Sequence, residues 1–297
     1  MQKVCLTLLF TFFLSICNAA SILIPMDEEQ KNHLKAYGIT YWALKNGAET
    51  DWLLNYRGGS FLIKYSQAME SECKIRGISY EVLSDGKVNI ILNEITDPSV
   101  NMDIVKLEKA PKIAVYSPKN KLPWDDAVTL VLNYAEIPYD IIYDDEVLKG
   151  TLPKYDWLHL HHEDFTGQYN RFWSAFRNAS WYMDDVKLQE ATAKRNGFKK
   201  VSEMKLEVAR NIRNFCAGGG FMFAMCSGPE TIDIALAANG IDIIDRVFDG
   251  DPADANAQSK LDFNQTFAFQ NFNVDLNPGS NEFSTIDSTP TRSQLLN

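Results

Sequence analysis

The chain has 297 residues, of which 45% are hydrophobic and 23% charged, which is the composition of an ordinary globular protein and excludes disordered, collagen-like and disulfide-framework classes. Its 39 acidic and 29 basic residues give a net charge of -10, and no basic run is long enough to neutralise a row of phosphates. Nucleic acid and anionic membrane surfaces are therefore not expected partners.

The first twenty residues have the pattern of a secretory signal peptide. Lys3 precedes an apolar run that ends at Ile16, and Ala19 and Ala20 supply the small residues of a cleavage site. The run is shorter than the about 20 residues that cross a bilayer. We therefore expect no membrane span and an exported chain, periplasmic or secreted, with lipidation of Cys17 as the alternative.

Residues 21–109 predict a small α+β domain. The paired glycines after Arg57 supply the positive φ that a hairpin turn needs, so two strands are expected on either side of them. The expected elements are a helix from Asp27 to Tyr37 ended by Gly38, strands Thr50 to Tyr56 and Ser60 to Tyr65, a helix Ser66 to Arg76, and a strand pair Ser79 to Leu83 and Val88 to Ile95.

From residue 110 to 297 strands and helices alternate, which predicts an α/β domain with a parallel sheet covered on both faces. The fully apolar run Phe221 to Met225 indicates a central strand, and Lys205 falls on the exposed side of an amphipathic helix. A helical insertion is expected at about 165–200. The other expected elements are strands 112–116, 139–143 and 155–162, and helices 124–135 (opened by Pro123), 202–217 and 230–239.

Cys226 follows the last of these strands and precedes a helix. A nucleophile on such a sharp turn is exposed, and the amides that open the helix stabilise an oxyanion and a thiolate. The pattern makes Cys226 a candidate catalytic nucleophile, with Ser227, Gly228 and Glu230 as candidate oxyanion- or substrate-binding residues. The alternative for Cys226 is a buried cysteine that ends a central strand. Cys216, in the apolar end of a helix, is expected to be a small buried hydrophobe.

These features resemble the class I glutamine amidotransferase-like superfamily. The resemblance rests on the strand at 112–116, the strand through His159, and the Gly218-Gly219-Gly220 to Gly228 turn. It implies a flavodoxin-like sheet in the order 2-1-3-4-5 and an elbow cysteine that attacks a carboxamide. A later His-x-Glu pair serves as base in that family, but no histidine follows Cys226 here. The resemblance thus implies either further strands past Asn297 or a base from elsewhere.

Over Ile22 to Asp262 the chain is similar to exported Bacteroidota proteins that are catalogued as asparagine synthetase B. An authentic synthetase of that type begins with a catalytic cysteine and carries a Ser-Gly-Gly-x-Asp-Ser loop for ATP. This chain starts Met1-Gln2 and contains no such loop. We therefore expect kinship with those proteins but not asparagine synthesis.

Three histidines lie together in the run His159 to Asp164. Strand alternation places His159 and His161 on one side, and His162, Glu163 and Asp164 enter the loop at the carboxyl end of the strand. In the 2-1-3-4-5 order this strand neighbours the one that ends at Cys226. Either histidine on the shared side is therefore a candidate base for the thiol.

The same run suits a divalent metal, because imidazole and carboxylate groups are ligands for zinc and manganese. A hydrogen-bonded surface network is the alternative. A second acidic run, from Asp249 to Asp254, suggests calcium, but Pro252 and the missing distal glutamate favour a solvated loop.

Three functions follow from these patterns. The first is hydrolysis or transfer at the carboxamide or acyl group of a small molecule by Cys226, with no cofactor. The second is an exported binding protein that keeps the fold without catalysis. The third is a metal-dependent hydrolase. Oligomeric state is not predicted.

Overall fold

The chain is a mixed α/β protein, seen as a computed structural model that describes residues 19–118 and 127–287. The signal segment up to residue 18 and the expected helix start at Pro123 lie outside the described residues. The chain divides into two compact units, one of Met1–Ala110 with Asn133–Ile137 and the other of Pro111–Leu132 with Pro138–Asn297.

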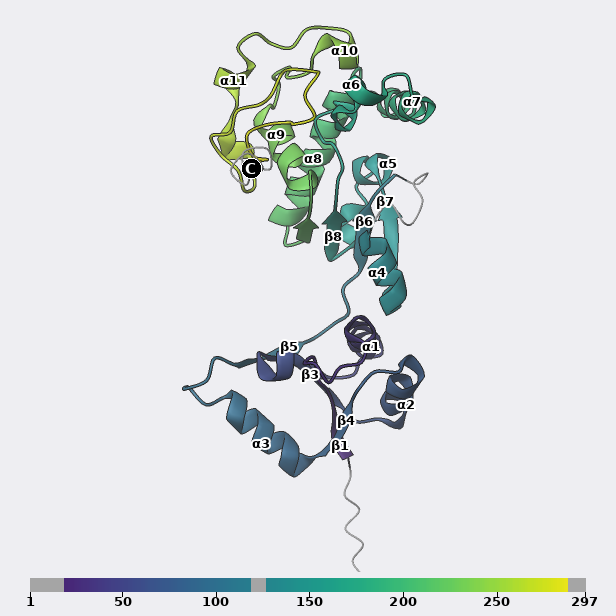
Figure 1. Cartoon of the computed structure of the whole chain (residues 1–297), viewed down its shortest axis with the longest axis vertical. Coiled ribbons are helices and arrows are strands. Elements are labelled where there is room, and N and C mark those ends of the chain that lie inside the picture. The colour runs from purple at the N-terminus through teal and green to yellow at the C-terminus, as the bar shows by residue number, and fades with distance from the viewer. Residues whose placement is uncertain (1–18, 119–126, 288–297) are drawn as a thin grey trace, which may run out of the picture. The chain divides into compact units, whose positions relative to one another are not determined.

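The first unit is a five-stranded antiparallel sheet in the order β4-β1-β3-β2-β5, with helices on both faces (Figure 1). Ile22 and Ile63 point to the face that α1 and α2 cover, while Leu23 and Leu62 point to the face that α3 covers. The elements are β1 (Ala19–Ile24), α1 (His33–Lys45), β2 (Thr50–Leu54), β3 (Ser60–Lys64), α2 (Gln67–Arg76), β4 (Glu81–Ser84), α3 (Asp85–Ile95) and β5 (Asp103–Leu107).

The expected hairpin is confirmed, because β2 and β3 pair antiparallel and both glycines of the turn have positive φ. The expected helix at 66–76 is also confirmed, with Ser66 accepting a hydrogen bond from the Met69 amide as its N-cap. Two expectations were wrong. The helix expected from Asp27 begins only at His33, after the cap Asn32, and runs past Gly38. The strand expected at Val88 to Ile95 is helix α3.

The second unit is built on a four-stranded parallel sheet in the order β7-β6-β8-β9. One face packs on α5, α8 and α9 through buried side chains such as Leu158, Leu160 and Ile212. The elements are β6 (Ile113–Tyr116), α4 (Ala127–Ala135), β7 (Tyr139–Ile142), α5 (Asp144–Leu148), β8 (Trp157–Leu160), α6 (Trp173–Phe176), α7 (Ser180–Arg195), α8 (Val201–Ala217), β9 (Phe221–Ala224), α9 (Gly228–Ala237), α10 (Arg246–Asp249) and α11 (Ala257–Lys260).

A second core extends beyond this sheet. It joins α7, α8 and α9 to the segment after α9, through residues such as Met204, Ile234 and Phe272. Arg171 anchors that segment, because its fully buried guanidinium donates to the carbonyl oxygens of Asp275, Asn277 and Ser280. The segment is therefore part of the folded unit, although up to residue 287 it contains only short helical turns and one isolated β-bridge.

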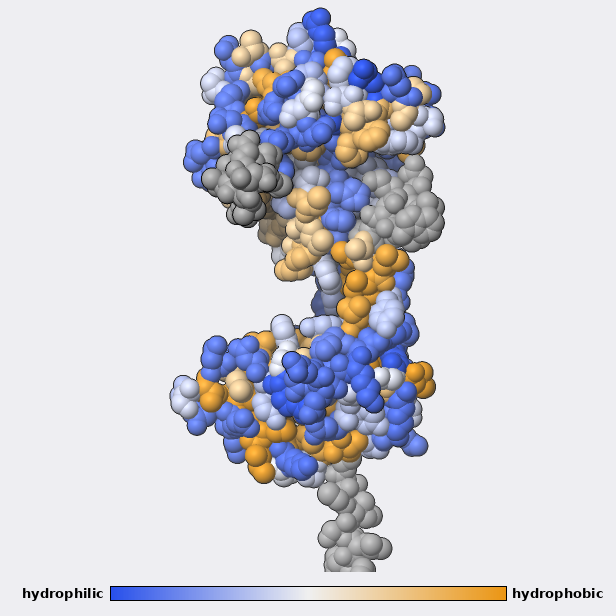
Figure 2. Space-filling model, viewed as in Figure 1, coloured by the Kyte–Doolittle hydropathy of each residue, from blue (hydrophilic) through white to orange (hydrophobic). Residues whose placement is uncertain are grey.

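The strand expected to be central lies at the edge of the sheet within the described residues. Phe221 and Phe223 of β9 are 59% and 46% exposed, so this part of the sheet edge presents apolar side chains. Pale orange side chains mark this surface beside β8 (Figure 2). An apolar run alone did not distinguish a central strand from an exposed edge strand.

Candidate functional site

The turn between β9 and α9 has the backbone of a nucleophile elbow. The Met225 amide donates to the carbonyl of Leu160 (3.1 Å), which continues the β8–β9 ladder to the end of the strand. Cys226 then has a φ of 52°, a left-handed conformation that costs a non-glycine residue about 1–3 kcal/mol. Helix α9 begins two residues later, at Gly228. The turn leaves Cys226 exposed.

Gly228 holds this turn against β8. A Cβ at Gly228 would lie 2.8 Å from the carbonyl oxygen of His161, so only glycine fits without displacing backbone. The Gly228 amide donates to that same oxygen (2.9 Å) and to Met225 (3.1 Å). It is therefore engaged in fixing the turn and is not free to bind an oxyanion, which leaves the Ser227 amide from the expected pair.

The expectation that the histidine strand lies next to the strand before Cys226 is confirmed. His159 pairs with Phe223 across β8 and β9, and their rings stack with centroids 6.0 Å apart. His159 is fully buried, and its ring centroid lies 6.3 Å from that of His161. Since β8 ends at Leu160, His161 belongs to the loop that follows, at the same sheet edge as Cys226.

His161 is tied to its neighbours through both its backbone and its ring. Its amide donates to the buried Glu163 carboxylate (2.8 Å), and its Nδ1 lies 3.1 Å from Nδ1 of His162. The carbonyl of Glu163 accepts from the hydroxyl of Thr231 in α9 (2.7 Å). The histidine loop and the start of α9 thus form one hydrogen-bonded frame around the elbow.

Asp164 organises a loop. Its carboxylate accepts hydrogen bonds from the amides of Thr166, Gln168 and Asn170 and from the Thr166 hydroxyl. Four donors on one buried carboxylate satisfy its lone pairs. The Asp164 carboxylate is therefore engaged by its own loop, which makes it a poor metal ligand beside the histidines.

The run His159 to Asp164 does not bring three metal-ligand atoms together. In the described part of the chain, the one group of three within 4.8 Å of one another is Asp242, Asp249 and Asp251. Lys200 Nζ lies between them at 2.6–3.0 Å, so an ammonium group already neutralises part of this cluster. Asp249 and Asp251 of the acidic run considered for calcium thus belong to a lysine-centred ion-pair cluster.

Glu230 points to the C-terminal segment. It is 7% exposed and accepts a hydrogen bond from the hydroxyl of Ser284 (2.6 Å). Burial raises the pKa of this carboxyl group above its ordinary value, and the Ser284 bond only partly offsets that effect. Its position in the first turn of α9 and its bond to Ser284 fit an anchor for the segment rather than an oxyanion donor.

A buried charged network lies at the carboxyl ends of β6 and β7. Lys205 is 1% exposed, and its ammonium group donates to Asp144 (3.0 Å), Tyr143 (3.1 Å) and Tyr116 (3.2 Å). Burial by itself would lower the pKa of Lys205, but Asp144 and Tyr143 together outweigh burial and raise the pKa. Burial also raises the pKa of both tyrosines.

The expectation that Lys205 is exposed was wrong. Lys205 follows Val201 by one helical turn and precedes Val208 by three residues, so it lies within the apolar stripe of α8. That spacing was a usable signal of burial. Its partner Asp144 is distant in sequence, and no local pattern links the two.

The three thiols of the described residues differ in environment. Cys226 is exposed, Cys216 is partly buried and Cys73 is buried. Burial raises the pKa of Cys73 to about 12 and also raises that of Cys216. Neither of the latter two is suited to act as a nucleophile at neutral pH, because the thiolate is the reactive form.

No protein-family model, curated protein or solved structure matches this chain. Within residues 19–118 and 127–287, no helix has both the length and the apolar character that crossing a bilayer requires.

Proposed function

We propose that the second unit carries a cysteine-dependent acyl-transfer or amide-hydrolysis site on a flavodoxin-like sheet of the class I glutamine amidotransferase-like type. The observation that carries this proposal is the positive φ of Cys226 in the turn from β9 to α9. Strained backbone at a non-glycine residue persists only where its surroundings enforce it, and such residues cluster at active sites. The strand order β7-β6-β8-β9, with parallel pairing, supports the same type of sheet.

The chemistry follows that of other thiol nucleophiles. The sulfur attacks the carbonyl carbon of a carboxamide, the amide nitrogen takes a proton and leaves as ammonia, and a thioester remains on Cys226. Water then attacks the thioester, which releases the carboxylic acid and restores the thiol. The Ser227 amide is the candidate oxyanion donor, and His161 is the preferred base because it follows β8 at the edge where the elbow lies.

The test uses p-nitrophenyl acetate as a general acyl donor. A nucleophilic thiol releases nitrophenolate in a rapid burst of about one equivalent per chain, before slower thioester hydrolysis. We expect this burst in the wild type and in Cys216→Ala, and its loss in Cys226→Ala. Ammonia release from glutamine and asparagine then identifies a carboxamide substrate.

A burst that persists in Cys226→Ala contradicts the proposal. Absence of a burst from the folded wild-type chain favours the alternative of a non-catalytic binding protein. His161→Ala is expected to slow the burst, with His33→Ala in the first unit as the matched control.

We also propose that the chain is exported, on the basis of the apolar run after Lys3 and the small residues Ala19 and Ala20. N-terminal sequencing of protein from its native host tests this, and retention of Met1 contradicts it.

A further inference from the structure

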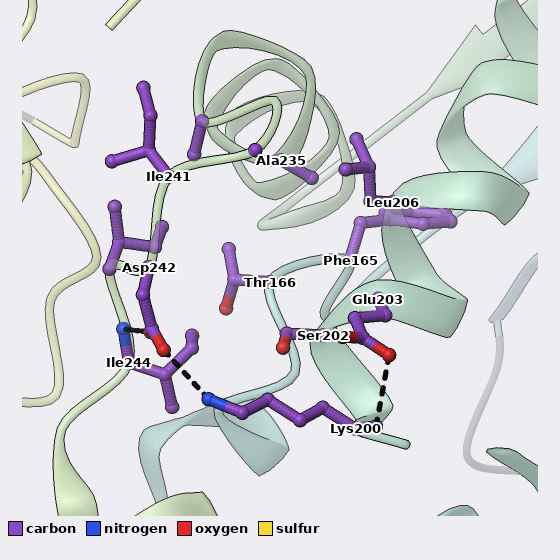
Figure 3. Close-up of a pocket in the computed structure, with 13 residues that line it drawn as sticks. Phe165, Thr166, Lys200, Ser202, Glu203, Leu206, Ala235, Ile241, Asp242 and Ile244 are labelled. Carbon is purple, nitrogen blue, oxygen red and sulfur yellow. Dashed lines mark hydrogen bonds and ion pairs between the residues drawn. The ribbon is translucent and has the colours of Figure 1, made fainter. Parts of the chain in front are cut away.

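A cavity of about 240 Å³ lies at the far end of α9 from the elbow (Figure 3). It is bounded by the start of α8, the last turn of α9 and the segment Gly240–Ile244. Cys226 precedes the first turn of α9, so the cavity is separate from the proposed catalytic site. Its lining residues are Phe165, Thr166, Lys200, Ser202, Glu203, Leu206, Ala235, Ala238, Gly240, Ile241, Asp242, Ile243 and Ile244.

Most of the wall is apolar. Phe165 is fully buried, Ile244 is 1% exposed, and Leu206 and Ile241 face each other across the space (Figure 3). The hydroxyl of Ser202 points into it from the first turn of α8. An apolar hollow with few polar groups is the usual form of a small-molecule site.

One wall is held in place by the loop that Asp164 organises. That carboxylate binds both the amide and the hydroxyl of Thr166. A Cβ at Gly167 would lie 2.7 Å from the Ser202 amide, so the loop packs directly on the backbone of α8. These contacts fix the Thr166 and Ser202 side of the cavity before any ligand arrives.

Part of the rim is held by the ion pair between Lys200 and Asp242 (2.7 Å). Lys200 also pairs with Asp249 and Asp251, so three carboxylates surround one ammonium group and leave a net negative charge. The Glu203 carboxylate already accepts from the amides of Lys199 and Lys200 at the start of α8. A ligand carboxylate or phosphate would therefore meet repulsion here.

We propose that this cavity binds a small uncharged molecule with one ring of benzene size and one hydroxyl group. A dry protein cavity of about 150 Å³ accommodates benzene, so the larger volume here leaves room for a short polar substituent. The ring would contact Leu206 and Ile241, which line the cavity and are partly exposed, and the hydroxyl would hydrogen-bond to Ser202. Net negative charge at the rim selects against acids of the same size.

Benzyl alcohol is the probe, titrated into the full chain and followed by calorimetry and ligand-observed NMR. Toluene and benzoate serve as comparators that lack the hydroxyl or carry a charge. We expect benzyl alcohol to bind most tightly and benzoate most weakly. Loss of one neutral hydrogen bond in Ser202→Ala is expected to weaken benzyl alcohol about fivefold and toluene hardly at all, whereas the exposed-site control Ser259→Ala changes neither.

Ala238→Leu fills the cavity from α9 and is expected to abolish binding of all three probes. Ala235→Leu repeats the test from the same helix if Ala238→Leu fails to fold. Absence of benzyl alcohol binding, or binding that survives a folded filled variant, overturns the proposal. Equal binding of benzoate and benzyl alcohol overturns the assigned ligand class. None of these outcomes depends on Cys226, whose burst is measured separately.

Discussion

The two units of this chain differ in which thiols and ion pairs they bury. In the first unit, helices cover both faces of the antiparallel sheet, Cys73 is buried, and the main ion pairs, such as Arg57 with Asp27 and Glu29, lie near the surface. In the second unit, a lysine–aspartate pair is fully buried, and Cys226 is held exposed in a left-handed conformation. Buried charge and left-handed backbone at a non-glycine residue both cost stability, and the second unit combines a fully buried ion pair with the left-handed Cys226 on which the proposed function rests.

The largest expected effect comes from Lys205→Met. Removing this ammonium group leaves Asp144 buried without its cation, and breaking a buried pair in this way costs about 3–5 kcal/mol. The matched change Lys74→Met in the first unit removes an ion pair with Glu70 in which the lysine is 62% exposed, and should change stability far less, because water screens an exposed pair. Urea unfolding of both variants measures the difference. Equal losses of unfolding free energy would show that the buried pair stabilises the fold no more than the exposed pair does.

Gly228→Ala should be the next most damaging change. Its Cβ would lie 2.8 Å from the His161 carbonyl oxygen, and because that atom belongs to the backbone, relief requires the elbow to move. We expect a loss of about 2–3 kcal/mol in the free energy of unfolding. Gly86→Ala in α3 is the control, since open space surrounds that position and alanine favours a helix by up to about 1 kcal/mol. A neutral Gly228→Ala would contradict the close packing of the elbow on the histidine loop.

Alkaline pH should weaken the second unit through its buried network. The pKa values of Tyr116 and Tyr143 are raised by burial, and that of Lys205 is raised because Asp144 and Tyr143 together outweigh the opposing effect of burial. The fold therefore holds these protons more tightly than the unfolded chain does. The stability they contribute is complete below about pH 10, the ordinary pKa of tyrosine, and falls above it by about 1.4 kcal/mol per pH unit for each group.

Chemical unfolding between pH 8 and pH 11, followed by tryptophan fluorescence, tests this dependence. Tyr143→Phe removes one of the titrating groups and should flatten the slope. A slope that Tyr143→Phe leaves unchanged argues against the network as its source.

A smaller effect is expected from relieving strain at Cys226. Cys226→Gly should be more stable than Cys226→Ala by about 1 kcal/mol, because only glycine adopts a φ of 52° without a steric cost. The same pair of substitutions at Cys216, inside helix α8, should have the opposite sign, with glycine about 1 kcal/mol worse than alanine. If the difference in stability between the glycine and alanine variants had the same sign at Cys226 and Cys216, the argument for strain at the elbow would fail.

Local patterns predicted much of the fold. The glycines after Arg57 identified the first hairpin, and alternation of apolar strands and amphipathic helices identified the parallel sheet. The error at α3 arose because the stretch from Val88 to Ile91 is rich in β-favouring residues, although Val88, Ile91, Leu92 and Ile95 also have helical spacing. Where a segment fits both a strand and a helix, tertiary packing decides which of the two forms.

The candidate site was predictable only in its parts. The strand–Cys–x–Gly–helix order located the turn at Cys226, and the positive φ agrees with the elbow inferred from it. The roles of individual groups depended on distant contacts that no local pattern contains. The Gly228 amide is bound by His161, the Asp164 carboxylate by its own loop, and Glu230 by Ser284.

The most direct test of the account is the rate at which each thiol of the folded chain reacts with iodoacetamide at neutral pH, mapped by mass spectrometry. Exposure alone would make Cys226 react like any surface thiol, so Ser259→Cys, at an exposed position, supplies the reference rate. We predict that Cys226 reacts faster than this reference, and that Cys216 and Cys73 react more slowly than either, because burial raises their pKa values. A Cys226 that reacts no faster than the reference thiol would contradict its assignment as an activated nucleophile.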